Sequence, residues 1–257
     1  MVFAQLALLG GLVIGAVLLL TEGPRFRAVG HILRNDPGPI RELDGYRGPA
    51  QIQGWAGPGP EGTVTAPLTG SECLAYRYDV EQFGPVGDNG QWKTQDTGMG
   101  GVDFVVEDDT GRVVVDPTGA EVHFEAHRET VSPGDEMPEH IAAFVAASPD
   151  VEPSGRTLDL RVREVTIGQR QRFTERRLDV GEQVSVYGQA TPGQAVEWGS
   201  DLVDALVADG DGLPAFVISD TDQRGTAWRI ARPALWKVLI GLNTLGIVVV
   251  VGGLFLL

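Results

Sequence analysis

Three groups of side chains in this 257-residue sequence have the chemistry to form a site. Asp108 and Asp109 lie between two apolar runs, and their carboxylates could hold Ca²⁺ near a turn. His123 and His127 lie four residues apart, so on a single strand over Glu121–Glu129 they would share a face. Cys73 could act as a nucleophile beside a histidine. Metal binding and nucleophilic catalysis are therefore the chemistries to weigh.

Metal binding has simpler alternatives at these residues. Asp side chains accept hydrogen bonds from backbone groups two residues on, so a turn accounts for Asp108 and Asp109. The spacing of His123 and His127 is not the helical H-E-x-x-H arrangement, and no third histidine follows nearby. With one cysteine in the sequence, neither an intramolecular disulfide nor a cysteine-rich zinc site can form. We expect no metal and no cofactor.

Cys73 also has a structural alternative. It begins Cys73–Phe83, where polar and apolar residues alternate as in a half-buried strand. A small apolar strand residue is commoner than a nucleophile, and no oxyanion-type turn accompanies Cys73. We therefore assign no catalytic residue. A membrane-bound hydrolase built from Cys73 and the histidines is kept as the alternative function.

The chain is organised around a hairpin over Phe104–Pro117. Its two apolar runs, Phe104–Val106 and Val113–Val115, are rich in β-branched residues and predict strands. The turn between them ends at Gly111, which we expect to adopt a positive φ. The hairpin predicts a β-rich domain with many non-local contacts.

Further strands and short helices follow from the periodicity of the sequence. Gly181 and Gly188 bracket a strand with Val184 and Val186 on one face, and the pattern resembles a partly open barrel of the oligonucleotide-binding type. The fold class is mainly β (α+β). Gly84–Gly101 is expected to be a long loop or an irregular hairpin, and helices are expected at Pro138–Ala147 and Asp201–Ala208. Strands are expected at Ala50–Ala56, Cys73–Phe83, Glu121–Glu129, Thr157–Val165, Gly181–Ala190 and Pro214–Ser219.

The charge of the chain excludes one class of partner. Acidic residues number 35 and basic residues 20, a formal charge of −15 that is typical of a salt-adapted surface and opposes binding to nucleic acid. The basic residues that do cluster either form ion pairs or meet acidic headgroups or an acidic loop of a partner. They are Arg161, Arg163, Arg170, Arg172, Arg176 and Arg177.

Both ends of the sequence predict membrane spans. Met1–Leu20 has no charged side chain, and twenty helical residues cover about 30 Å, the thickness of the hydrocarbon layer. Ala234–Leu257 is similarly apolar, with Trp236 and Lys237 placed as interfacial anchors. Glycines in both spans could pack the helices closely or support a homo-oligomer. We expect a multi-pass protein of the cell membrane with a β-rich domain at residues 21–233.

The flanking charges predict the side of the membrane on which this domain lies. Neither terminus carries a basic side chain, whereas seven basic residues lie near the inner flanks of the spans. The positive-inside rule then places the domain in the cytoplasm, and an extracellular domain is the alternative. The seven are Arg25, Arg27, Arg34, Arg224, Arg229, Arg232 and Lys237.

Several motifs, taken in order, resemble the GIDE domain, also called the BAM (beside-a-membrane) domain, of MULAN-type ubiquitin ligases and their prokaryotic relatives. The resemblance covers most of residues 24–257 and implies a membrane-anchored module that recruits or senses a protein partner. The ligases add a RING, which needs about eight Cys and His ligands. This sequence has one Cys and four His, so we expect no ligase activity. The matching stretches are Ala66–Phe83, Trp92, Phe104–Pro117, Phe173–Ala190 and Phe216–Asp220.

Overall fold

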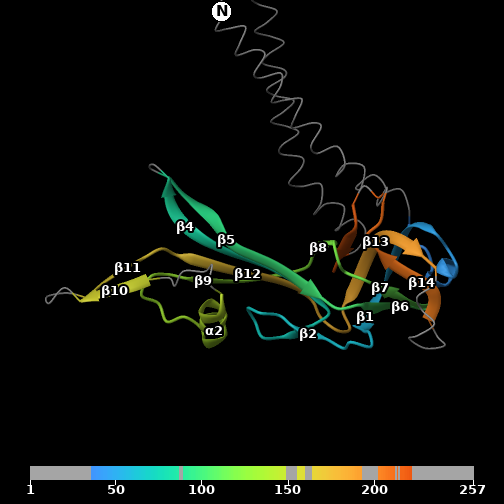
Figure 1. Ribbon diagram of the computed structural model, residues 1–257, viewed down its shortest axis with the longest axis horizontal. Helices are drawn as coiled ribbons and strands as arrows, with labels where there is room; N and C mark the ends of the chain where they lie inside the picture. The colour runs from blue at the N-terminus through green and yellow to red at the C-terminus, as the bar shows by residue number, and fades with distance from the viewer. Residues whose placement is uncertain are drawn as a thin grey trace, which may run out of the picture.

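The computed structural model describes residues 36–86, 89–148, 155–159, 164–192, 202–211, 213 and 215–221. These residues form a mainly β structure with a short α-helix (Figure 1). The expected spans Met1–Leu20 and Ala234–Leu257 lie outside these ranges. Among the residues that the structure describes, no helix has the length and apolar character needed to cross a membrane.

Most elements are strands, and their bounds are as follows. The helical elements are the 3₁₀ helix η1 (Ile40–Leu43) and α2 (Glu139–Ala147). The strands are β1 (Gly48–Pro58), β2 (Val64–Thr65), β3 (Glu72–Cys73), β4 (Ala75–Val86), β5 (Asn89–Gly101), β6 (Phe104–Asp108), β7 (Gly111–Val115), β8 (Glu121–His123), β9 (Ala126–Val131), β10 (Gly155–Asp159), β11 (Glu164–Gly168), β12 (Gln171–Leu178), β13 (Gln183–Thr191), β14 (Leu202–Ala208) and β15 (Val217–Ser219).

Five of these strands close into a barrel in the order β1-β6-β7-β14-β13, with β13 pairing again with β1. The closing pair is antiparallel and runs from Gly48↔Ala190 to Trp55↔Gln183. The β7–β14 pair is parallel. We expected a partly open barrel, and that expectation is wrong. The first strand of the order, β1, pairs with β6 along one edge and with the last strand, β13, along the other, which closes the barrel.

The interior of the barrel is the main hydrophobic core. Along β1, Ala50, Ile52 and Ala56 point inward, because successive side chains of a strand face opposite sides. Phe104 of β6 and Val186 of β13 meet them in the same cluster. Complete burial of a large side chain such as Ile52, Phe104 or Val186 stabilises the fold by about 1.5–3 kcal/mol. The same alternation leaves the other residues of β1 on the outer face of the barrel.

A second sheet, in the order β5-β4-β12-β9, extends away from the barrel (Figure 1). It is made by two insertions into the barrel sequence: β4 and β5 lie between β1 and β6, and β9 and β12 lie between β7 and β13. Helix α2 covers one face of this sheet, where its Ile141 packs with Leu68, Val80 and Phe173. The chain passes from β12 into the barrel strand β13 through a turn at Gly181, whose φ is +83°.

Two expected elements differ because tertiary pairing decides their structure. The single strand expected over Glu121–Glu129 is two strands, and these belong to different sheets. The chain leaves β8 at buried Phe124, so it cannot continue straight into β9. Asp201–Ala208 has apolar residues at helical spacing, yet residues Leu202–Ala208 form β14. There Ala205 and Val207 fill the barrel between β7 and β13.

Gly84–Gly101, expected as a long loop or an irregular hairpin, includes the end of β4 and all of β5, which pair antiparallel with a shift in register near Val80. The structure thus agrees with the hairpin alternative, and β5 is stabilised across the β4–β5 pair. Tyr78 lies opposite Gly98 and Tyr76 lies opposite Gly100. Their rings cover the glycines so closely that a Cβ atom at Gly98 would lie 2.4 Å from the Tyr78 ring. Aromatic side chains thus replace the packing that the glycines lack. The single strand expected over Thr157–Val165 instead includes parts of two strands, β10 and β11, which pair antiparallel.

Candidate functional site

The β6–β7 hairpin is held by the side chain of Asp108. Its Oδ1 accepts hydrogen bonds from the Thr110 backbone N (2.7 Å), the Thr110 hydroxyl (2.6 Å) and the Gly111 backbone N (2.9 Å). Gly111 is already a strand residue paired with Asp108, and it is not among the described glycines with positive φ. The expectation of a positive φ at Gly111 is therefore wrong, because Asp109 and Thr110 alone make the turn.

Asp108 also fixes the first helical element onto the hairpin. Its Oδ2 accepts from the backbone N of Ile40 at 3.0 Å, and the Thr110 hydroxyl accepts from the backbone N of Arg41 at 3.2 Å. Ile40 is completely buried in the barrel core. Burial acts to raise the pKa of Asp108, but the hydrogen bonds from Thr110, Ile40 and Gly111 outweigh it and hold that pKa below 3.8. The carboxylate is therefore charged at neutral pH.

The segment leading into η1 lies against β1 and is held there by a 2.9 Å bond from the Gly38 N to the Gln51 carbonyl. A pocket lies on each side of it. The Tyr46 pocket has a volume of about 500 Å³ and is lined by Asp36, Gly38, Pro39, Glu42, Leu43, Tyr46, Pro49, Ala50, Gln51 and Tyr187. The Trp55 pocket has a volume of about 490 Å³ and is lined by Pro37, Gly38, Pro39, Gln53, Gly54, Trp55, Asp108, Asp109 and Gln183.

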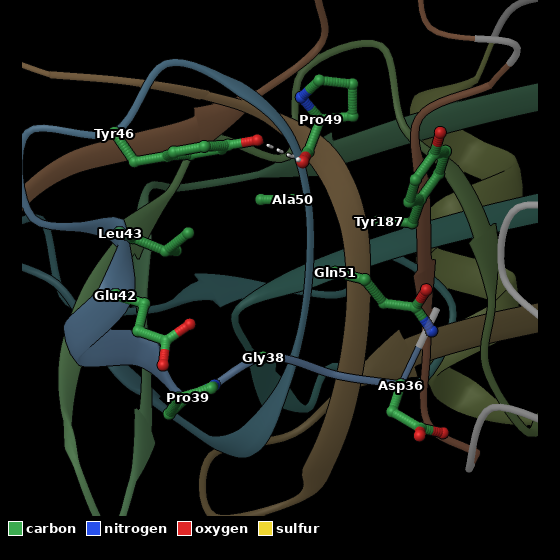
Figure 2. Close-up of a pocket in the computed structure, with 10 residues that line it drawn as sticks. All are labelled: Asp36, Gly38, Pro39, Glu42, Leu43, Tyr46, Pro49, Ala50, Gln51 and Tyr187. Atoms are coloured by element: carbon green, nitrogen blue, oxygen red, sulfur yellow. Dashed lines mark hydrogen bonds between the residues drawn. The ribbon is translucent and has the colours of Figure 1, made fainter. Parts of the chain in front are cut away.

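Figure 2 shows how the Tyr46 pocket is built. Tyr46 forms one wall, where its hydroxyl donates to the Pro49 carbonyl at 3.3 Å. Tyr187 projects from β13 on the opposite side, and Glu42 comes from η1. Burial raises the pKa of the Tyr187 hydroxyl, so it stays protonated. The pocket therefore combines aromatic rings with carboxylates.

The outer faces of β1 and β13 supply the floor of both pockets. Strand alternation turns Gln51, Gln53 and Trp55 outward. The register sets Gln51 opposite Tyr187 and Trp55 opposite Gln183. Side chains from one end of the barrel sequence thereby meet side chains about 130 residues away in the chain. The arrangement offers amides, rings and acids to a ligand.

Cys73 lies in β3 and is completely buried. Burial, together with the nearby negative charges of Asp179 and Glu175, raises the pKa of its thiol to about 12. A thiol in this environment stays protonated and out of reach of solvent, whereas a nucleophilic cysteine needs its thiolate. The hydrolase alternative gains no support from this residue.

His123 and His127 are not brought together. His123 lies in β8 of the barrel sheet, with its Nε2 3.3 Å from Glu121 Oε1. His127 lies in β9 of the second sheet and is exposed. Within the part of the chain that the structure describes, no group of three or more His, Cys, Asp or Glu side chains could hold a metal ion.

The described arginines of the basic region lie on β12 or beside it and are paired. Arg172 contacts Glu81 at 2.7 Å and stacks over the Trp92 ring, with its Cζ 4.3 Å from the ring centroid. Arg176 contacts Asp79 at 2.6 Å. Arg170 stacks on Phe83 and Trp92, and Arg177 contacts Asp179, while Arg161 and Arg163 lie outside the described residues. These contacts favour the ion-pair interpretation of the basic region.

Sequence reasoning missed a buried carboxylate in the second sheet. Glu175 of β12 is 1% exposed and accepts hydrogen bonds from the backbone N of Leu68 (2.8 Å), the backbone N of Thr69 (3.1 Å) and the Thr69 hydroxyl. It ties the turn before β3 to the sheet across 106 residues of sequence. No local pattern signals such a contact, because its donors are backbone groups of a distant turn. The Tyr46 pocket was not predicted either, because its lining residues, such as Glu42 and Tyr187, are far apart in the sequence.

The described part of the chain is thus a module made of a closed β-barrel and an inserted β-sheet, with two acidic, aromatic pockets on the outside of the barrel. Residues 86–201 match the family model GIDE, described as E3 Ubiquitin ligase. The resemblance to the GIDE domain is confirmed over this segment, which runs from the end of β4 to the residue before β14. No curated protein and no solved structure matches the chain.

Proposed function

We propose that this chain is a membrane-anchored interaction module of the GIDE type, which recruits or senses a protein partner at the bilayer surface. The observation that carries the proposal is the GIDE match over residues 86–201. Two uncharged runs, Met1–Leu20 and Val238–Leu257, support the anchoring. The basic residues beside them support a cytoplasmic position for the domain.

The barrel supports a binding role because its strand order, with a parallel pair between β7 and β14, is OB-like. Barrels of this kind present ligand sites on their outer face and loops. Here the acidic character of the chain favours a protein ligand over nucleic acid. Ligase chemistry is not proposed for these residues, since one Cys and four His cannot supply the roughly eight ligands of a RING.

Three measurements test the proposal, two on native membranes and one on intact spheroplasts. Alkaline carbonate extraction should leave the chain in the membrane pellet, and an amine-reactive cross-linker should capture the same protein partner in repeated preparations. Release of the chain by carbonate would contradict the anchoring. Failure of any partner to be enriched over a membrane protein of matched abundance would contradict the recruiting role. A protease added to intact spheroplasts should spare the domain, and digestion would place it outside.

A further inference from the structure

We propose that the Tyr46 pocket and the Trp55 pocket together bind an extended, basic polypeptide segment, with a Lys or Arg side chain entering each pocket. This inference rests on the proposed function, because it names the chemical class of the protein partner. The evidence for this inference is separate from the GIDE match, since most of the residues that line the two pockets precede the matching segment.

The charges that line the two pockets have a single sign. Asp36 and Glu42 line the Tyr46 pocket, and Asp108 and Asp109 line the Trp55 pocket. No Lys or Arg is among the described residues that line either pocket. The arginines of β12, by contrast, contact carboxylates of their own sheet. A cationic side chain is the complement that these pockets lack.

Aromatic rings are exposed at the same place. Trp55 is 59% exposed and Tyr46 is 41% exposed, which is unusual for large rings on the surface of a folded domain. The face of an aromatic ring attracts Lys and Arg, and Trp does so most strongly. Each pocket therefore provides a ring together with carboxylates, which is the combination that holds a cationic side chain on a protein surface.

The arrangement of the pockets favours a polypeptide. They share a wall at Gly38 and Pro39, so one extended chain crossing this wall could place a side chain on each side of it. Amides of Gln51, Gln53 and Gln183 line the path and can bond a peptide backbone. The amine of a phospholipid headgroup brings a phosphate with it, and four carboxylates would repel that phosphate.

The test uses the full chain in uncharged detergent micelles and a fluorescein-labelled decapeptide of Gly and Ser with two Lys and two Arg. Binding is followed by fluorescence anisotropy. The double variant Glu42→Gln/Asp109→Asn removes one charge from each pocket and spares the hydrogen bonds of Asp108. The matched control is Glu72→Gln/Glu136→Gln, which removes the same charge at two exposed positions outside both pockets.

We expect the pocket variant to bind the peptide roughly three- to tenfold more weakly than the unaltered chain, and the control to change by less than about twofold. Trp55→Ala should weaken binding by roughly threefold through the lost ring contact. Equal weakening by the pocket and control variants would overturn the proposal, because net charge alone would then explain binding. Displacement of the peptide by millimolar glycerophosphoethanolamine would overturn it in favour of a lipid amine.

The failure of this inference is distinguishable from failure of the proposed function. If the pocket variant loses the peptide but native-membrane cross-linking still captures the same partner, the partner uses another surface and only this inference is wrong. If the unaltered chain captures no partner in membranes, the proposed function itself is wrong, whatever the peptide does.

Discussion

Replacing Asp108 with Ala should destabilise the barrel. The carboxylate accepts four hydrogen bonds, three within the hairpin turn and one from the backbone N of Ile40. The residue before η1, Pro39, makes no side-chain capping bond, so Asp108 caps this helix from a distant part of the chain. Its loss releases both the turn and the helix.

The size of the effect follows from these contacts. Loss of a capping side chain costs about 0.5–2 kcal/mol, and hydrogen bonds to a charged group contribute about 1.5–3 kcal/mol. Because one carboxylate serves all four donors, the terms overlap, and we expect about 2–4 kcal/mol in total. For a domain of this size, that lowers the Tm by roughly 4–16 °C. Asp108→Asn keeps one acceptor oxygen and should cost about half as much.

Thermal unfolding of the full chain in detergent, followed by circular dichroism, measures this effect. Asp109→Ala is the matched control, because Asp109 is the next residue in the same turn and is exposed. It should change the free energy of unfolding by no more than about 0.5 kcal/mol. If Asp108→Ala and Asp109→Ala lower the Tm equally, the hydrogen bonds of Asp108 do not stabilise the domain and the reasoning is refuted.

Four further outcomes follow from the structure. Because hydrogen bonds lower the pKa of Asp108 in the folded chain, its stabilising effect is present above pH 3.8 and is lost as the pH falls through the folded-state pKa. The Tm difference between the unaltered chain and Asp108→Asn should therefore shrink in acid. A difference that stays constant with pH would contradict this. Cys73 should resist alkylation until the chain is unfolded, and labelling of the native protein at pH 7 would show that the thiol is reachable. Gly98→Val should cost about 1–3 kcal/mol by meeting the Tyr78 ring, whereas Gly57→Ala should not destabilise, because its Cβ would meet only the Val105 carbonyl oxygen at 4.0 Å. Glu175→Gln should cost about 1–3 kcal/mol, because an amide nitrogen cannot accept from Thr69, and an unchanged Tm would refute that role.

The sequence predicted the elements whose signals are local. The hairpin over Phe104–Pro117 was predicted from its two β-branched runs, and both strands are present as β6 and β7. The short helix expected at Pro138–Ala147 is α2. The turn aspartates were also interpreted correctly at Asp108, whose carboxylate bonds the backbone of the turn. In each case, neighbours in the chain carry the information.

The remaining features depend on residues far apart in the sequence. The barrel is closed because β1 pairs with β13, and no local pattern indicates that β1 has a partner on each edge. Residues Leu202–Ala208 are a strand because β7 and β13 leave room for one between them. The pockets were not predicted, since they need the η1 segment to fold back against β1 and Tyr187 to come from β13.

Photo-cross-linking from the Trp55 pocket in native membranes tests the central claim most directly. The photoreactive residue p-benzoylphenylalanine would replace Trp55 in one variant and Val180 in another, because Val180 is also exposed, at 49%, and lies outside both pockets. We predict a discrete adduct with one protein from position 55, weakened when Glu42→Gln is added, and little or none from position 180. Equal adducts from both positions, or none from position 55, would contradict a partner-binding site on this face of the barrel.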